Sequence, residues 1–93
     1  PQAKHPIGAT VTTLQVIEGL QKLDGAGVTE LADYLEMSSS NVHNYLNTLR
    51  QEGFVRKEGS QYYVGLQFLE LGAYARQRRP IYEVAMPELR ELA

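Results

Sequence analysis

The sequence of 93 residues is long enough for one small domain, and its lack of cysteine excludes disulfides and thiolate metal sites. No apolar stretch reaches the roughly 18 residues that a membrane-spanning helix needs, so we expect a soluble, cytoplasmic protein. The net charge of −2 is unusual for a protein that binds nucleic acid. Residues 39–79, however, carry six basic and only three acidic side chains, so a local basic surface is compatible with the sequence.

The first part of the chain has the pattern of two helices after an irregular start. Residues 1–9 contain two prolines and a glycine without periodicity, so we expect a flexible lead-in. From Thr10 to Asp24 apolar residues recur at every third position, which predicts a helix that ends at the glycine-rich residues 25–27. A second, short helix follows, and Thr29 is its expected N-cap because its hydroxyl can accept from free backbone N–H groups.

A third helix is predicted from Ser39 to Glu52, after a serine-rich turn that can cap its first N–H groups. Its apolar stripe, at the spacing i, i+3, i+4 and i+7, consists of Val42, Tyr45, Leu46 and Leu49. The opposite face carries hydroxyl and amide side chains and almost no charge. Because such residues are poorer helix formers than the glutamate and lysine of an ordinary solvated face, this composition favours a binding surface.

A β-hairpin is predicted directly after Gly53, where the third helix should stop. Its strands are expected at residues 54–57 and 61–64, joined by a polar turn at residues 58–60. By alternation, the side chains expected to face the core are Phe54, Tyr62 and Val64, and those expected on the exposed face are Lys57 and Tyr63.

Helical periodicity resumes at Gly65 and is interrupted at Pro80, because proline cannot donate a backbone hydrogen bond and disfavours helix just before it. The predicted fold class is mostly α with a small β-hairpin. We interpret residues 10–79 as a winged helix-turn-helix domain and residues 80–93 as a C-terminal linker helix. The apolar face of this linker helix needs a partner.

Catalytic and metal sites are not indicated by the sequence. The two histidines are far apart, and the carboxylates are scattered over predicted solvent faces. The glycines at residues 25–27 lack both the length and the lysine of a phosphate-binding loop. We therefore expect no enzyme activity, no cofactor and no metal.

The third helix instead has the size and chemistry of an element that reads double-stranded DNA. About 14 residues would run about 21 Å, enough to lie in a major groove about 12 Å wide. Asparagine can pair with adenine through two hydrogen bonds, and serine or histidine can contact several base edges. The candidate base-reading residues are Ser40, His43, Asn44 and Asn47. The candidate phosphate contacts are Thr29, Ser39, Arg50, Arg56 and Lys57.

Several short segments match a family pattern when they are taken together. They are Thr29-Glu30-Leu31-Ala32, Ser40-Asn41-Val42-His43, Thr48-Leu49, Glu52-Gly53-Phe54-Val55, Tyr62-Tyr63-Val64-Gly65 and Gly65-Leu66-Gln67-Phe68-Leu69-Glu70-Leu71-Gly72. This pattern resembles the N-terminal DNA-binding domain of IclR-type transcriptional regulators over about residues 10–93. The last segment is the most specific, because it is similar to the family's Leu-Gly…Leu-Gly segment after the wing.

The resemblance implies a homodimer that binds a palindromic operator in double-stranded DNA. It also implies a small-molecule effector, bound by a C-terminal domain that is absent from this chain. Dimerisation would use the first helix and the linker helix, with the candidate interface residues Val11, Leu14, Ile17, Ile81, Val84 and Leu89. The chain departs from the family at Ser39, where a basic residue is frequent, and at Asn44, where arginine is common. Both departures remove charge, so the operator cannot be copied from relatives.

One alternative from another class of function stays open. A winged helix can also serve as a protein–protein interaction or dimerisation module without specific DNA readout. The acidic residues 1–38 and the apolar linker helix would then form the binding surfaces. Retardation of a DNA duplex at moderate salt would distinguish the two.

Overall fold

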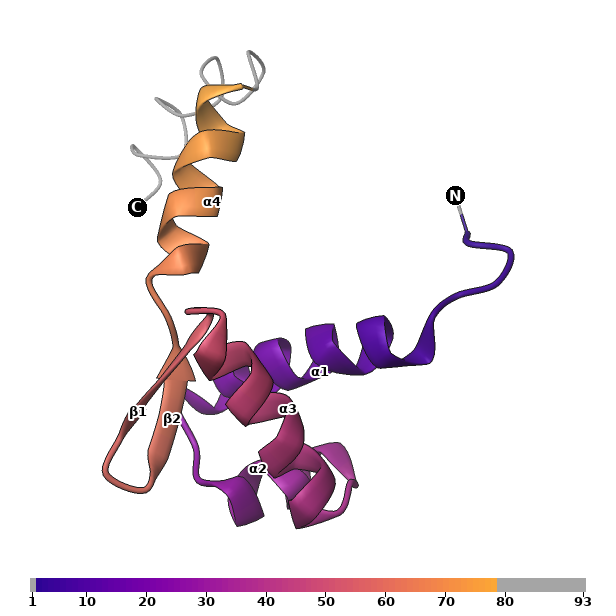
Figure 1. Cartoon of the computed structure of the whole chain (residues 1–93), viewed down its shortest axis with the longest axis vertical. Coiled ribbons are helices and arrows are strands. Elements are labelled where there is room, and N and C mark those ends of the chain that lie inside the picture. Colours follow the sequence, from indigo (N-terminus) through magenta and orange to yellow (C-terminus); the bar gives the residue numbers. More distant parts are fainter. Residues whose placement is uncertain (1, 79–93) are drawn as a thin grey trace.

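The computed structural model describes residues 2–78 and places a β-hairpin against three helices, with a fourth helix extending away from them (Figure 1). In chain order the elements are α1 (Gly8–Leu23), α2 (Val28–Leu35), α3 (Ser39–Gln51), β1 (Val55–Glu58), β2 (Gln61–Val64) and α4 (Gln67–Gln77). This order confirms the predicted mostly helical chain with one hairpin. The expected linker helix over residues 80–93 lies outside the described residues. None of the helices in residues 2–78 is long and apolar enough to cross a membrane.

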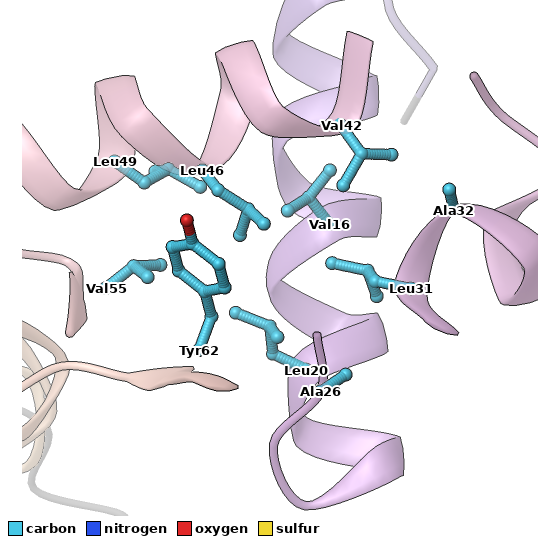
Figure 2. Packing of buried hydrophobic residues seen from close by; sticks show 10 residues of the cluster. All are labelled: Val16, Leu20, Ala26, Leu31, Ala32, Val42, Leu46, Leu49, Val55 and Tyr62. Carbon is cyan, nitrogen blue, oxygen red and sulfur yellow. The ribbon is translucent and has the colours of Figure 1, made fainter. Parts of the chain in front are cut away.

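The core lies where α1, α2, α3 and the inner face of the hairpin meet, with α3 lying across α1 (Figure 2). Its buried members are Val16, Leu20, Ala26, Leu31, Ala32, Val42, Leu46, Leu49, Val55 and Tyr62. Burying one such leucine contributes roughly 1.5–3 kcal/mol to folding. Because the three α3 residues in this core form one stripe, packing also fixes which face of α3 remains in solvent.

Helix α3 begins and ends as the sequence predicts, to within one residue at its end. Ser38 is the N-cap, and its Oγ accepts from the backbone N–H of Asn41 at 3.2 Å. At the other end Gly53 adopts a left-handed conformation with φ +86°. The N–H of Gly53 donates to the carbonyl of Arg50, and that of Phe54 donates to the carbonyl of Leu49. These two bonds form a Schellman-type cap that satisfies the last carbonyls of the helix.

Replacing Ser38 by alanine should lower the free energy of unfolding by about 1 kcal/mol, because the backbone N–H of Asn41 loses its side-chain acceptor. Urea denaturation of the two proteins measures this difference. Ser40→Ala is the matched control, since the Ser40 hydroxyl has no hydrogen-bond partner within residues 2–78. If both variants lost the same stability, the cap would contribute nothing of its own.

The starts of the first two helices differ from the sequence predictions. Helix α1 begins at Gly8, because the carbonyl of Ile7 accepts from the N–H groups of Thr10 and Val11, both at 3.1 Å. Helix α2 begins at Val28 after Gly27, whose backbone is extended, and no side chain caps it. The prediction of Thr29 as N-cap is therefore wrong. The preceding segment pairs with the hairpin and enters the helix directly, which places Thr29 inside the first turn.

The hairpin is a two-stranded antiparallel pair with its turn at Gly59 and Ser60. The opposed residues are Val55 and Val64, Arg56 and Tyr63, Lys57 and Tyr62, and Glu58 and Gln61. An isolated bridge ties the hairpin to the α1–α2 turn. In this bridge the N–H of Ala26 donates to the carbonyl of Tyr62 at 3.0 Å, and the N–H of Tyr62 donates back at 2.8 Å.

The predicted faces of the first strand are wrong, because the turn has two residues, Gly59 and Ser60, instead of the three expected, and this shifts the pairing of the strands by one residue. Val55, and not Phe54, is the buried residue of this strand. Opposed residues of an antiparallel pair share a face. Lys57 therefore lies on the same face as buried Tyr62, with its Nζ 5.5 Å from the ring centroid. A shift of one residue exchanges the two faces of a strand.

Helix α4 leaves the body of the domain after a tight junction at Gly65 (Figure 1). The N–H of Gly65 donates to the carbonyl of Phe54 at 2.8 Å, and the rings of Phe54 and Phe68 meet edge-on with centroids 4.9 Å apart. No residue of α4 is buried, and its neighbourhood exposes the large apolar side chains Leu66, Leu69, Leu71 and Tyr74. An eleven-residue helix with this little support is marginal by itself.

Candidate nucleic-acid interface

The outer face of α3 presents the side chains that the sequence predicts to read bases. All of them are exposed: Ser40, His43, Asn44 and Asn47. They lie opposite the buried stripe of Val42, Leu46 and Leu49, because packing against α1 and the hairpin leaves only this face in solvent. The nominated residues thus share one accessible surface of one helix.

The exposed face of α3 divides into a hairpin side and an α1 side. On the hairpin side, Nδ2 of Asn47 lies 3.5 Å from each ring nitrogen of His43, so the two side chains lie next to one another one turn apart. On the α1 side, the Thr48 hydroxyl donates to the carbonyl of Asn44 at 2.9 Å. Asn44 and Thr48 also border a mostly apolar hollow of about 330 Å³ between α3 and the start of α1. The amide of Asn44 makes no hydrogen bond within residues 2–78.

A second hollow of about 420 Å³ lies between the start of α2, α3 and the hairpin, and we call it the wing groove. Its lining residues are Gly27, Val28, Thr29, Glu30, His43, Lys57, Ser60, Gln61 and Tyr62. The first N–H groups of α2 have no intrahelical acceptor, and no side chain caps them. Together with the Lys57 ammonium and the Thr29 hydroxyl, they make the groove suitable for an anionic oxygen.

The remaining phosphate candidates do not lie in the wing groove. Arg56 lies on the opposite face of the hairpin, where its guanidinium forms an ion pair with Glu58 and lies 4.7 Å from the centroid of the Tyr63 ring. Ser39 and Arg50 are exposed at the two ends of α3. The structure therefore brings Thr29 and Lys57 together and places the other three candidates apart.

Two polar residues of the wing groove, Ser60 and Gln61, were missed by the sequence reasoning. Ser60 lies in the hairpin turn and Gln61 directly follows it, and the α1–α2 segment comes close to them because of the bridge between Ala26 and Tyr62. A Cβ added to Gly27 would lie 3.3 Å from the carbonyl oxygen of Ser60. This approach joins residues far apart in sequence, and no local pattern in the chain could have indicated it.

The candidate dimer residues are only partly covered by the structure. Val11 and Leu14 are 44% and 55% exposed on α1, whereas Ile17 is half-buried and packs against the core. Ile81, Val84 and Leu89 lie outside the described residues. Within residues 2–78, no group of three histidine, aspartate or glutamate side chains is arranged to hold a metal ion.

The pattern of the chain matches a known domain family. The family described as the IclR helix-turn-helix domain matches residues 10–59, from α1 to the turn of the hairpin. The chain belongs to this family, as the resemblance of its short segments predicts.

The two relatives and the solved structure described next align with nearly the whole of this chain. The HTH-type transcriptional regulator KdgR of Escherichia coli is 30% identical over 89 residues, covering 94% of this chain and 34% of that protein. The "Probable HTH-type transcriptional regulator ArcR" of Halobacterium salinarum is 28% identical over 88 residues, with coverage of 94% and 34%. The crystal structure of an IclR transcriptional regulator from Alicyclobacillus acidocaldarius superposes with a TM-score of 0.84 at 25% identity, covering 96% of this chain and 37% of that one.

These likenesses confirm the predicted winged helix-turn-helix fold. The chain spans about a third of the length of the relatives that it matches. The activity of a whole regulator, including its effector, therefore enters only as a proposal.

Proposed function

We propose that this domain binds double-stranded DNA for a dimeric, cytoplasmic transcriptional regulator, with α3 as the recognition helix in the major groove. The observation that carries the proposal is the outer face of α3, where exposed hydroxyl, imidazole and amide groups follow one another without a charged side chain among the four candidates. Membership in the IclR helix-turn-helix family and relatives named as transcriptional regulators support it.

Base reading would be carried by Ser40, His43, Asn44 and Asn47. The 13 residues of α3 span about 20 Å, which suits a helix lying in the major groove. Asn44 would offer a free amide for a two-hydrogen-bond contact with adenine. His43 and Asn47, which lie next to one another one turn apart, would contact neighbouring base pairs on the hairpin side.

Phosphate contacts would hold the domain in register without reading sequence. Lys57 and Thr29 would bind backbone oxygens at the wing groove, where the N–H groups of α2 add partial positive charge. Ser39 and Arg50 would contact phosphates at the two ends of α3. Arg56 would contact a phosphate once its ion pair with Glu58 is broken. Glu30 also borders the groove, so a bound phosphate would sit nearer to Lys57 than to the middle of α2.

Dimerisation would bring two such helices onto the half-sites of a palindromic operator. The exposed Val11 and Leu14 of α1 support this, as does the uncovered apolar surface of α4. Ile17 would contribute through its exposed part, and Ile81, Val84 and Leu89 through the segment beyond the described residues. A small-molecule effector would act through a C-terminal domain, as the length of the relatives suggests.

Retardation of a mixed-sequence duplex at moderate salt tests the proposal against a pure interaction module. A DNA-binding domain slows the duplex at micromolar protein, since non-specific affinities typically lie at about 10⁻⁴ to 10⁻⁶ M. An interaction module would leave the duplex unshifted at every concentration. No comparison favours the interaction module.

Replacing Asn44 by alanine should weaken binding to the preferred duplex by about 1–3 kcal/mol and leave binding to an unselected duplex almost unchanged. The reason is that a base contact is lost while the phosphate contacts remain. Fluorescence anisotropy with both duplexes measures the two affinities. Asn41→Ala is a matched control, because Asn41 is an exposed asparagine on the flank of the same helix. Equal losses on both duplexes would exclude Asn44 as a base-reading residue.

A further inference from the structure

The side chain of Tyr63 makes a contact on the outer face of the hairpin, away from the proposed DNA-binding surface. Its half-buried ring lies against Gly25 in the turn between α1 and α2. A Cβ added to Gly25 would come within 2.2 Å of Cε1 and 2.5 Å of Cδ1 of the ring. Gly25 has φ +93° and follows Asp24 at φ 54°, so this turn uses two successive left-handed residues to present bare backbone to the ring.

The first strand of the hairpin adds a second contact to the same ring. Arg56 is the cross-strand partner of Tyr63, and its guanidinium carbon lies 4.7 Å from the ring centroid. Glu58, two residues along the same strand, forms an ion pair with that guanidinium. The ring therefore joins both strands of the hairpin to the α1–α2 turn.

This contact complements the backbone bridge between Ala26 and Tyr62, which connects the hairpin to the α1–α2 turn. The two hydrogen bonds between Ala26 and Tyr62 hold β2 beside the α1–α2 turn but act along one line. A pair of four-residue strands has little stiffness of its own. The Tyr63 ring lies beside that line, on the other face of β2, and opposes rotation of the hairpin about it.

The angle of the hairpin matters because Lys57 lies on its inner face, at the wing groove, with Thr29 and His43 among the other lining residues. Rotation about the bridge would carry the Lys57 ammonium away from the start of α2. We propose that Tyr63 is a positioning residue for DNA binding: by packing on Gly25 it fixes the wing angle at which Lys57 and α2 share one phosphate. The inference rests on the proposed DNA binding and adds a residue that does not touch DNA.

The test is a double-mutant cycle on the chain, measured with a duplex selected from a random pool and with an unselected duplex of equal length. Tyr63→Ala should weaken binding to both duplexes about 3- to 10-fold, as should Lys57→Ala, because each removes the same phosphate contact. In the Lys57→Ala background, Tyr63→Ala should have no further effect. The slope of log K against log salt should become shallower by about 0.9 per protomer in each single variant.

Matched variants separate positioning from a general loss of structure. Tyr63→Phe retains the ring and should keep the wild-type slope and affinity. Tyr34→Ala removes a half-exposed tyrosine from α2, away from the wing groove, and should leave the salt slope unchanged. If Tyr63→Ala does not fold by circular dichroism, Tyr63→Thr, which suits a strand but has no side chain long enough to pack against Gly25, takes its place with the same expectation for the cycle.

Two results would overturn the inference. One is a folded Tyr63 variant without the ring whose affinity and salt slope equal those of the wild type. The other is a cycle in which the Tyr63 and Lys57 effects multiply, because Tyr63 would then act independently of the lysine. Failure of the unmodified chain to bind either duplex would instead overturn the proposed function itself, and with it the basis of the inference.

Discussion

Raising the salt concentration from about 50 to about 200 mM should weaken DNA binding by the dimer about a thousandfold. In the proposed complex each protomer would offer three cationic side chains to phosphates, namely Arg50, Arg56 and Lys57. Neutralising about six phosphates gives a slope of log K against log salt near −5, because each releases condensed counterions at about 0.9 per contact. Anisotropy titrations over this salt range measure the slope.

The same titration distinguishes the contributions of the two hairpin bases. Lys57 lines the wing groove, whereas Arg56 is engaged by Glu58 and Tyr63 on the other face. A slope near −3.6 would mean that Arg56 stays with Glu58 in the complex. Arg56→Gln is then expected to leave the slope unchanged, while Lys57→Gln makes it shallower by about 2 per dimer. A flat salt response would contradict the electrostatic account altogether.

Replacing Gly65 by alanine should lower the free energy of unfolding by about 2–3 kcal/mol, the scale of overpacking in a well-packed site. Gly65 is buried, and a Cβ there would lie 2.7 Å from the carbonyl oxygen of Gly53 and 2.9 Å from the carbonyl carbon of Phe54. These are backbone atoms of the cap that ends α3, so they cannot turn aside as a flexible side chain would. In a domain of this size the melting temperature should fall by about 10–20 °C.

Gly59→Ala is the matched control for this prediction. Gly59 also needs a positive φ, of 61°, but a Cβ there meets nothing within 4 Å. Only the left-handed conformation would then be penalised, by about 1 kcal/mol. Thermal denaturation of both variants separates backbone conformation from crowding at the junction. Gly65→Ala melting at or above the temperature of Gly59→Ala would show that the close approach is not a constraint.

The features of the chain that depend on local sequence were predictable. The cap of α3, its buried stripe and its glycine stop all follow from residues within one or two turns of each other. The exposure of Asn44 and Asn47 follows from the same periodicity. The structure also explains the first residue of the Gly65–Gly72 segment that resembles the family, because only glycine fits against the end of α3 at that position.

The hairpin faces could not be predicted correctly, because they depend on the pairing of the two strands, and the turn has two residues, Gly59 and Ser60, instead of the three expected. The N–H of Phe54 is used by the carbonyl of Leu49 in the helix cap, so Phe54 belongs to that cap and β1 starts at Val55. The bridge between Ala26 and Tyr62 is likewise a long-range contact. The register of the two strands and this bridge together place Lys57 in the wing groove and Arg56 outside it.

Selection of duplexes from a random pool by the intact chain tests the central claim, that α3 reads bases in the major groove for a dimer. The expected result is enrichment of a two-fold symmetric site whose half-sites lie one helical turn, about 10 base pairs, or a multiple of it apart. The preferred bases should change when Asn44 or Asn47 is replaced. Recovery of duplexes without any common sequence, or of a site whose base preferences survive both replacements, would contradict it.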